Sequence, residues 1–153
     1  LKVLASETFS SVSAPIQYAA ITAHKNNHDD YIQKSKNILK SVGNYVYENL
    51  KSNDVLINKP QGGFYLMPEF VGKKFNSSSE MCKDILEKTG VALLPGSDFG
   101  FKENKLLARL SFTDFDGQVF FEKTQNEKID DSTIKKFAPK VIEGVDKLKN
   151  WSK

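Results

Sequence analysis

The chain has 153 residues, a formal net charge of +3, 39% hydrophobic residues and 27% charged residues. These values are typical of one folded domain and exclude collagen-like, disulfide-rich and strongly disordered chains. Acidic residues are interspersed among the lysines, which disfavours nucleic-acid binding, and the absence of a run of about 18 apolar residues disfavours a membrane span. Arg109 is the only arginine among 22 basic residues. Any task that needs a planar cation with several N–H donors therefore has a single candidate.

The first half of the chain predicts two helices followed by two strands. Residues 1–13 are rich in serine and threonine and are expected to be extended or loop-like. Apolar residues then recur at steps of three and four, first after Pro15 and again after Asp29. The predicted elements are a helix from Pro15 to about His24, a helix over Asp29–Leu50, and strands over Val55–Asn58 and Phe64–Phe70.

The second half predicts a helix, two strands and a final helix. Ser77 and Glu80 have the spacing of a capping box, and Gly90 is typical of a helix end. The elements expected here are a helix between Ser77 and Gly90, strands over Val91–Leu94 and Leu106–Phe112, a short helix and a loop within Asp116–Lys128, and a helix over Ile134–Trp151. The pattern predicts an α+β fold, with a small, mostly antiparallel sheet and helices packed on one face.

Metal and nucleophile chemistry have weak support in the sequence. His24 and His28 are four residues apart but lack a third ligand, so solvent-exposed polar residues are favoured over a zinc site. Cys82 has no base nearby in the sequence and is expected to be a half-buried thiol. The glycines fit neither nucleotide-binding fingerprint. We predict no metal site and no catalytic residue in this chain.

Three segments combine a strand pattern with glycines or with the single arginine. They are Pro60–Leu66, Gly90–Gly100 and Leu107–Phe112, and alternation in the third puts Leu107, Arg109 and Ser111 on one face. A charge among apolar neighbours is costly unless it is paired. Two interpretations remain open: an internal ion pair with Glu69, Asp98 or Asp114, or an arginine that pairs with an anionic ligand on binding.

These three segments, together with Ser10–Ala20, resemble the C-terminal part of class I/II aminotransferases, which are pyridoxal-phosphate (PLP) enzymes of fold type I. The resemblance extends from about Ser6 to Trp151, and the order and spacing of its motifs carry it. It implies that Arg109 binds the α-carboxylate of the substrate, and that Phe64 and Gly63 line the substrate pocket. It also implies that the Pro95–Ser97 turn forms the loop at the mouth of that pocket. For Phe64 a plain core position stays open, and for Pro95–Ser97 a simple strand-end turn does.

The sequence also departs from the family pattern. It has no serine–lysine element followed closely by glycine and arginine, which in the family carries the Schiff-base lysine; Ser35-Lys36 is the nearest imitation. We therefore expect residues 1–14 to be a connecting segment from a missing PLP-binding domain, and residues 15–153 to be the small domain. We expect this fragment to bind no PLP and to be inactive alone.

For the full-length parent, the resemblance implies PLP, amino-acid and 2-oxo acid substrates, a homodimer, and a cytoplasmic location with a mitochondrial one possible. Two alternatives stay open: a fold type I PLP lyase, in which the same arginine would serve, and a free-standing carboxylate-binding module.

Overall fold

The computed structural model describes residues 2–8, 11–124 and 129–153. Its contacts divide the chain into two units, Leu1–Ile32 and Gln33–Lys153. The first unit contains helices α1 (Lys2–Thr8) and α2 (Ala14–Lys25) and the start of α3 (Asp29–Leu50). The helix at Lys2–Thr8 corrects the expectation of an extended start. Lys2, Leu4 and Glu7 favour helix more strongly than the nearby serines and threonines oppose it.

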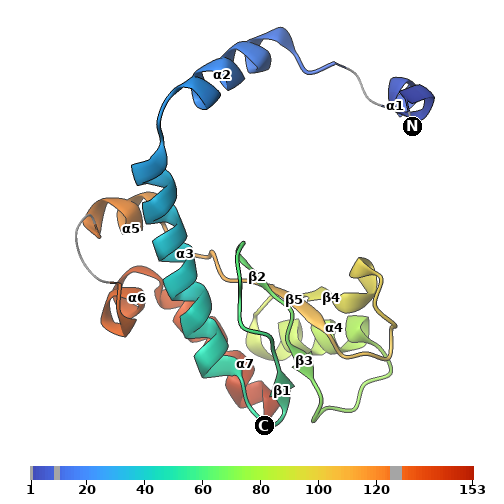
Figure 1. Cartoon of the computed structure of the whole chain (residues 1–153). Helices are drawn as coiled ribbons and strands as arrows, with labels where there is room; N and C mark the ends of the chain where they lie inside the picture. Colours follow the sequence, from blue (N-terminus) through green and yellow to red (C-terminus); the bar gives the residue numbers. More distant parts are fainter. Residues whose placement is uncertain (1, 9–10, 125–128) are drawn as a thin grey trace. The chain divides into compact units, whose positions relative to one another are not determined.

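The second unit contains the rest of α3, five short strands and five further helices among the described residues (Figure 1). The elements after α3 are β1 (Val55–Leu56), β2 (Tyr65–Leu66), β3 (Glu69–Phe70), α4 (Ser78–Thr89), β4 (Leu94–Pro95), the 3₁₀ helix η1 (Gly96–Phe99), β5 (Ala108–Ser111), α5 (Gly117–Lys123), α6 (Asp131–Phe137) and α7 (Pro139–Ser152). The α+β class is confirmed. In the segment 116–128, where a short helix and a loop were expected, the structure contains α5, and residues 125–128 lie outside the described ranges.

The strands form two small antiparallel sheets. One pairs β1 with β3, and the other has the order β2-β5-β4 with β5 in the centre. The predicted strand over Phe64–Phe70 is thus two strands in different sheets, separated by Met67 and Pro68. Proline has no N–H to donate to a ladder, so the chain changes partner at this point. The carbonyl of Pro68 still accepts a hydrogen bond from Ala108 N–H (3.0 Å), which links the two sheets.

The predicted C-terminal helix is also divided. Ala138 adopts φ −128° and ψ 49°, outside the helical region, between α6 and α7. Pro139 explains the break, because a proline disfavours helical backbone at the residue before it and itself suits the first turn of a new helix. The capping of α4 agrees with its sequence signature: Ser77 Oγ accepts from Glu80 N–H (3.1 Å), and Gly90 is the C-cap residue.

One hydrophobic core joins α3, α4, α7 and the buried side of the strands. Its contributors include Ile38, Val42, Val46, Leu50, Phe70, Met81, Ile85, Leu110, Phe112, Val145 and Leu148. Trp151 closes one end of this core: its Nε1–H donates to Asp84 Oδ2 (2.8 Å), and its ring meets the edge of Phe70 and stacks on Phe75. The strands are therefore backed by helices, and their other side carries the candidate site.

Candidate carboxylate-binding site

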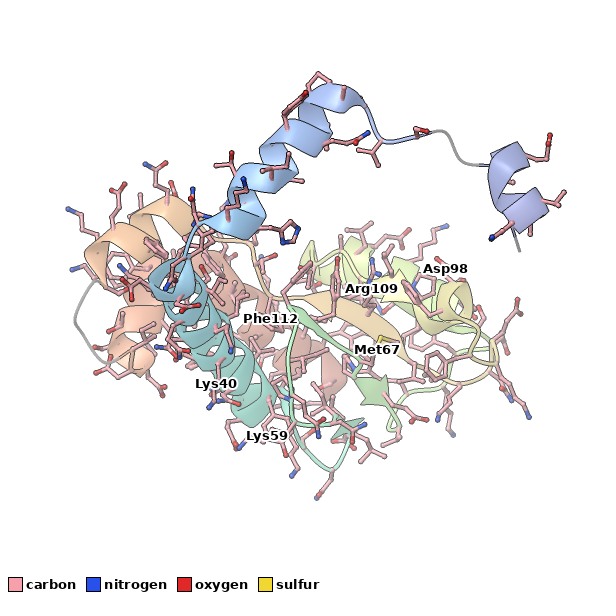
Figure 2. The ribbon with its side chains drawn as sticks, turned by 45° about the horizontal axis from the view of Figure 1, so that its top comes forward. Lys40, Lys59, Met67, Asp98, Arg109 and Phe112 are labelled. Carbon is pink, nitrogen blue, oxygen red and sulfur yellow. The ribbon has the colours of Figure 1, made fainter. Side chains whose placement is uncertain are left out.

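Arg109 lies in the central strand of the three-stranded sheet. In the ladder, Leu94 is opposite Arg109, and Tyr65 is opposite Ser111. Residues that face each other across strands share a face of the sheet, so Leu94, Arg109, Tyr65 and Ser111 lie on one face. That face is exposed, with Leu94 at 44% and Tyr65 at 42%, whereas the alternate residues Ala108 and Leu110 are buried. The alternation predicted from the sequence holds for Arg109 and Ser111, which share the exposed face, whereas Leu107, which precedes β5, is buried. Figure 2 labels Arg109 among the side chains.

The Arg109 guanidinium contacts two aromatic rings and no carboxylate among the described residues. Its Cζ lies 4.3 Å from the ring centroid of Tyr65 and 4.4 Å from that of Phe99. Of the three internal partners considered above, Glu69 pairs with Lys105 (3.6 Å) and Asp114 with Lys140 (3.7 Å). Asp98 forms no ion pair with Arg109 either, within the part of the chain that the structure covers. The arginine is half-buried, and it makes no ion pair with a described carboxylate.

Phe64 and Gly63 lie directly before β2, beside this face. Phe64 is 40% exposed and is therefore not a core residue, and its ring centroid lies 4.3 Å from that of Tyr65. Its carbonyl accepts from Phe112 N–H (3.3 Å), which continues the pairing of β2 with β5. Gly63 has φ +68°, a conformation that other residues rarely adopt. The structure thus brings Phe64 into contact with Tyr65, and Tyr65 into contact with Arg109.

Phe99 reaches Arg109 because η1 lies tightly against the chain that enters β5. Gly96 N–H donates to the carbonyl of Leu107 (2.8 Å), and a Cβ at position 96 would lie 2.8 Å from the Leu107 Cβ. Only glycine permits this approach. The Pro95–Ser97 segment is therefore more than a strand-end turn, since it begins the 3₁₀ helix that carries Phe99. The sequence analysis did not identify Tyr65 or Phe99 as neighbours of Arg109.

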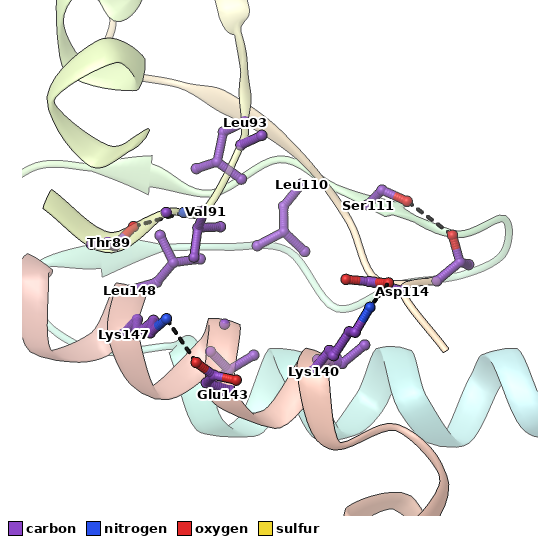
Figure 3. Close-up of a pocket in the computed structure, with 16 residues that line it drawn as sticks. Thr89, Val91, Leu93, Leu110, Ser111, Asp114, Lys140, Glu143, Lys147 and Leu148 are labelled. Atoms are coloured by element: carbon purple, nitrogen blue, oxygen red, sulfur yellow. Dashed lines mark hydrogen bonds and ion pairs between the residues drawn. The ribbon is translucent and has the colours of Figure 1, made fainter. Parts of the chain in front are cut away.

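A cavity of about 660 Å³ lies away from Arg109, between α7 and the segments around Val91 and Ser111 (Figure 3). Its charged side chains pair with each other: Lys140 with Asp114, and Lys147 with Glu143 (2.7 Å). Arg109 does not line this cavity. Because these four charges are paired internally, the cavity is a weaker candidate for an anion than the face around Arg109.

The two histidines and the cysteine occupy different environments. His24 is in α2, whereas His28 lies beyond its end, and both are exposed. No cluster of His, Cys, Asp and Glu suited to a metal ion occurs among the described residues. Cys82 is buried in the core, more fully than expected, and burial, with the nearby Asp98 charge, raises the pKa of its thiol to about 11. None of the helices within the described ranges has the length and apolarity to cross a membrane.

Comparison with known proteins identifies the family. The sequence profile described as "Aminotransferase class I and II" matches residues 1–118. The chain belongs to the class I and II aminotransferases. A probable aspartate/prephenate aminotransferase of Aquifex aeolicus is 33% identical over 101 residues, which cover 63% of this chain and 26% of that protein. A probable N-acetyl-LL-diaminopimelate aminotransferase of Bacillus subtilis is 37% identical over 91 residues, 59% of this chain and 22% of that protein.

Solved structures of this aminotransferase family support the assignment. The structure of the aspartate aminotransferase of Thermotoga maritima is similar to this chain, with a TM-score of 0.61 and 25% sequence identity. The match covers 97% of this chain and 31% of the Thermotoga chain. An aspartate aminotransferase of Rhizobium meliloti has the same fold, with a TM-score of 0.67 at 18% identity, over 98% of this chain and 34% of its own. The chain spans about a quarter of the length of the curated relatives described above.

The family implies PLP in the parent aminotransferase, but the described residues do not fit a complete PLP site. Such a site needs a lysine beside a cradle of polar groups for the phosphate and the ring. Lys105, four residues before Arg109, pairs with Glu69. Within the described ranges, no buried side-chain nitrogen or oxygen lacks a hydrogen-bond partner. Among the described residues, the face around Arg109 is therefore the candidate for binding an anion.

Proposed function

We propose that this chain forms the small domain of a longer PLP-dependent aminotransferase and that Arg109 binds the α-carboxylate of its substrate. The observation that carries the proposal is the half-buried guanidinium of Arg109, which contacts two rings and forms no ion pair with a carboxylate of the described residues. A guanidinium matches a carboxylate through two parallel, charge-assisted N–H···O bonds. Such a pair fixes the angle of the substrate as well as its place.

Phe64 and Gly63 are proposed to line the same substrate pocket. The Phe64 ring is 40% exposed and contacts Tyr65, which contacts Arg109, so an apolar wall lies beside the cation. Gly63, with its positive φ, sets the turn that delivers Phe64 to this face. This combination of one cation and an apolar wall is typical of sites that hold small carboxylates by one end.

The remaining parts of an aminotransferase site are assigned to the longer protein. We propose that residues 1–14 connect to a PLP-binding domain and that residues 15–153 form the small domain. Support comes from the quarter-length match to the relatives and from the absence, in this sequence, of the serine–lysine element followed by glycine and arginine. The chain alone is then inactive. The amino-acid and 2-oxo acid substrates, the homodimer and the cytoplasmic location of the parent rest on family membership.

The reaction proposed for the parent is transfer of an amino group between an amino acid and a 2-oxo acid. PLP supplies the bond-breaking chemistry in this family, and the protein supplies binding and orientation. The share of this chain is to bind the carboxylate at Arg109 and to present the rest of the substrate to the missing domain.

The test is Arg109→Lys in the full-length protein. Lysine keeps the charge but has one compact ammonium group in place of the two-pronged fork, so kcat/KM should fall by a factor equivalent to about 1–3 kcal/mol. Lys102→Arg, at an exposed position in the segment between η1 and β5, is the control and should leave kcat/KM unchanged. Wild-type kinetics for Arg109→Lys would refute the assignment.

A further inference from the structure

Two aromatic side chains occupy the place that an internal carboxylate would take beside Arg109. Tyr65 and Phe99 each have a ring centroid within 4.4 Å of the guanidinium Cζ. Both rings are 40% exposed or slightly more, so neither is needed to fill the core. Their position therefore requires a reason other than packing of the interior.

The rings come from elements on opposite sides of β5. Tyr65 belongs to β2, which pairs with one edge of the central strand, and Phe99 ends the 3₁₀ helix that follows β4 on the other edge. Tyr65 is opposite Ser111, so it lies diagonally across from Arg109, within reach of a long side chain. Phe99 is held in place by the tight approach of Gly96 to Leu107. The strand pairing of β2 thus fixes the position of Tyr65, and the packing of η1 against Leu107 fixes the position of Phe99.

A ring and a carboxylate act differently on an arginine. A carboxylate accepts the N–H bonds and neutralises the cation, so it competes with any anionic ligand. A ring face attracts the cation through its quadrupole but does not take up its N–H donors as a carboxylate does. An arginine held by rings is consequently restrained in position while its charge and donors remain available to a ligand.

We propose that Tyr65 and Phe99 are positioning residues that hold the Arg109 guanidinium in its carboxylate-binding orientation. The inference rests on the proposed function of Arg109 and adds the reason why this arginine needs no internal counter-ion. The two rings act through Arg109 and need not touch the carboxylate themselves.

The chain offers a direct spectroscopic test because it contains one arginine. A ¹⁵N-labelled sample of the full 153-residue chain gives a single arginine Nε–Hε signal, which reports on Arg109 without assignment. The probe is sodium propionate, titrated at ionic strength kept constant with sodium chloride. In the wild type, we expect the signal to shift saturably with propionate.

The ring substitutions should change both the signal and the affinity. Tyr65→Leu and Phe99→Leu each remove a ring current, so each should move the Nε–Hε resonance of the unliganded chain. Each should also raise the Kd for propionate about threefold, and the double variant about tenfold. Tyr65→Phe keeps the ring and should retain the wild-type Kd. Phe101→Leu is the matched control, because Phe101 is 42% exposed and has no ring contact with Arg109 within the described residues.

The outcomes separate the two proposals. If the wild type binds propionate and both leucine variants bind it as tightly as Phe101→Leu does, Arg109 is a carboxylate ligand but the rings do not position it, and the inference is overturned. If the wild-type signal shows no saturable shift, the proposed function fails as well. A rise in Kd confined to Tyr65→Leu and Phe99→Leu supports both.

Discussion

Arg109 differs from the lysines around it in what it contacts. Lys105 and Lys140 each take a nearby carboxylate, from Glu69 and Asp114, whereas the guanidinium contacts only rings among its described charge and ring contacts. Exposed ion pairs such as these contribute only about 0–1 kcal/mol to the stability of the fold. Their effect on the site is to occupy the acids that would otherwise compete for Arg109. Arg109, in contrast, contacts the rings of Tyr65 and Phe99 and forms no ion pair with a described carboxylate.

Cys82 provides a second prediction for a single residue. Burial, with a smaller effect of the Asp98 charge, raises the pKa of its thiol from 9.0 to about 11. Because the thiolate is the reactive form, alkylation by iodoacetamide in the folded chain should be slow at about pH 8 and should accelerate towards pH 11. The raised pKa stabilises the fold below about pH 9, and this contribution is lost as the pH rises from 9 towards 11.

The measurement is the alkylation rate against pH, with and without urea. In urea, the midpoint should return to about 9, the ordinary value. Equal rates in the folded and unfolded chain at about pH 8 would mean that Cys82 is not buried in the core.

At the scale of elements, local signals predicted most of the helices. The stripe of Ile38, Val42 and Val46 predicted α3, and Ser77 with Gly90 predicted both ends of α4. The errors at Phe64–Phe70 and Ile134–Trp151 come from Pro68 and Pro139, since an apolar pattern continues across each proline although the backbone pairing does not. The helix at Lys2–Thr8 was missed because none of its described side chains is buried, which leaves no amphipathic pattern to detect.

The candidate site was predictable only in part. Alternation within one segment was enough to put Arg109 and Ser111 on the same face of the strand, but it failed for Leu107, which is buried. Its contacts with Tyr65 and Phe99 depend on the strand register and on the path of η1, which join residues far apart in the sequence. Such contacts have no local signal, although Gly96 and Gly63 marked the segments that make them.

The N-terminus of α4 gives a prediction at this scale. Ser77 Oγ accepts from Glu80 N–H (3.1 Å), while Glu80 Oε2 accepts from Asn76 N–H (3.0 Å), so the cap satisfies two backbone donors. Ser77→Ala should lower the free energy of unfolding by about 1 kcal/mol, because one donor loses its partner. Ser79→Ala, two residues into the same helix and exposed, is the control.

Urea denaturation of both variants checks this prediction. If Ser77→Ala and Ser79→Ala lower the free energy of unfolding by a similar amount, the loss does not come from the N-cap.

At the scale of the molecule, the chain supplies one part of an aminotransferase site. Its core and its two small sheets are built by the second unit. The exposed face of one sheet carries Arg109 with two ring contacts, Tyr65 and Phe99, and Phe64 contacts Tyr65. Family membership and the quarter-length match therefore place the reactive centre, in our proposal, in the remainder of a longer protein.

This proposal predicts the behaviour of the isolated chain with PLP. The chain has 21 lysines, all of them able to react weakly with the aldehyde, but we expect none to be preferred. After incubation with PLP and reduction with borohydride, peptide mapping should show low labelling spread over several exposed lysines. Stoichiometric labelling of a single lysine would mean that the chain builds a cofactor site of its own.

The most direct test of the central claim uses the reaction of arginine with phenylglyoxal. Since the chain has a single arginine, mass spectrometry follows the modification of Arg109 alone. Propionate should slow this modification saturably and several-fold, whereas sodium chloride at equal ionic strength should not, and the protection should disappear in urea. Equal rates with propionate and with chloride in the folded chain would contradict the assignment of Arg109 as the carboxylate-binding residue.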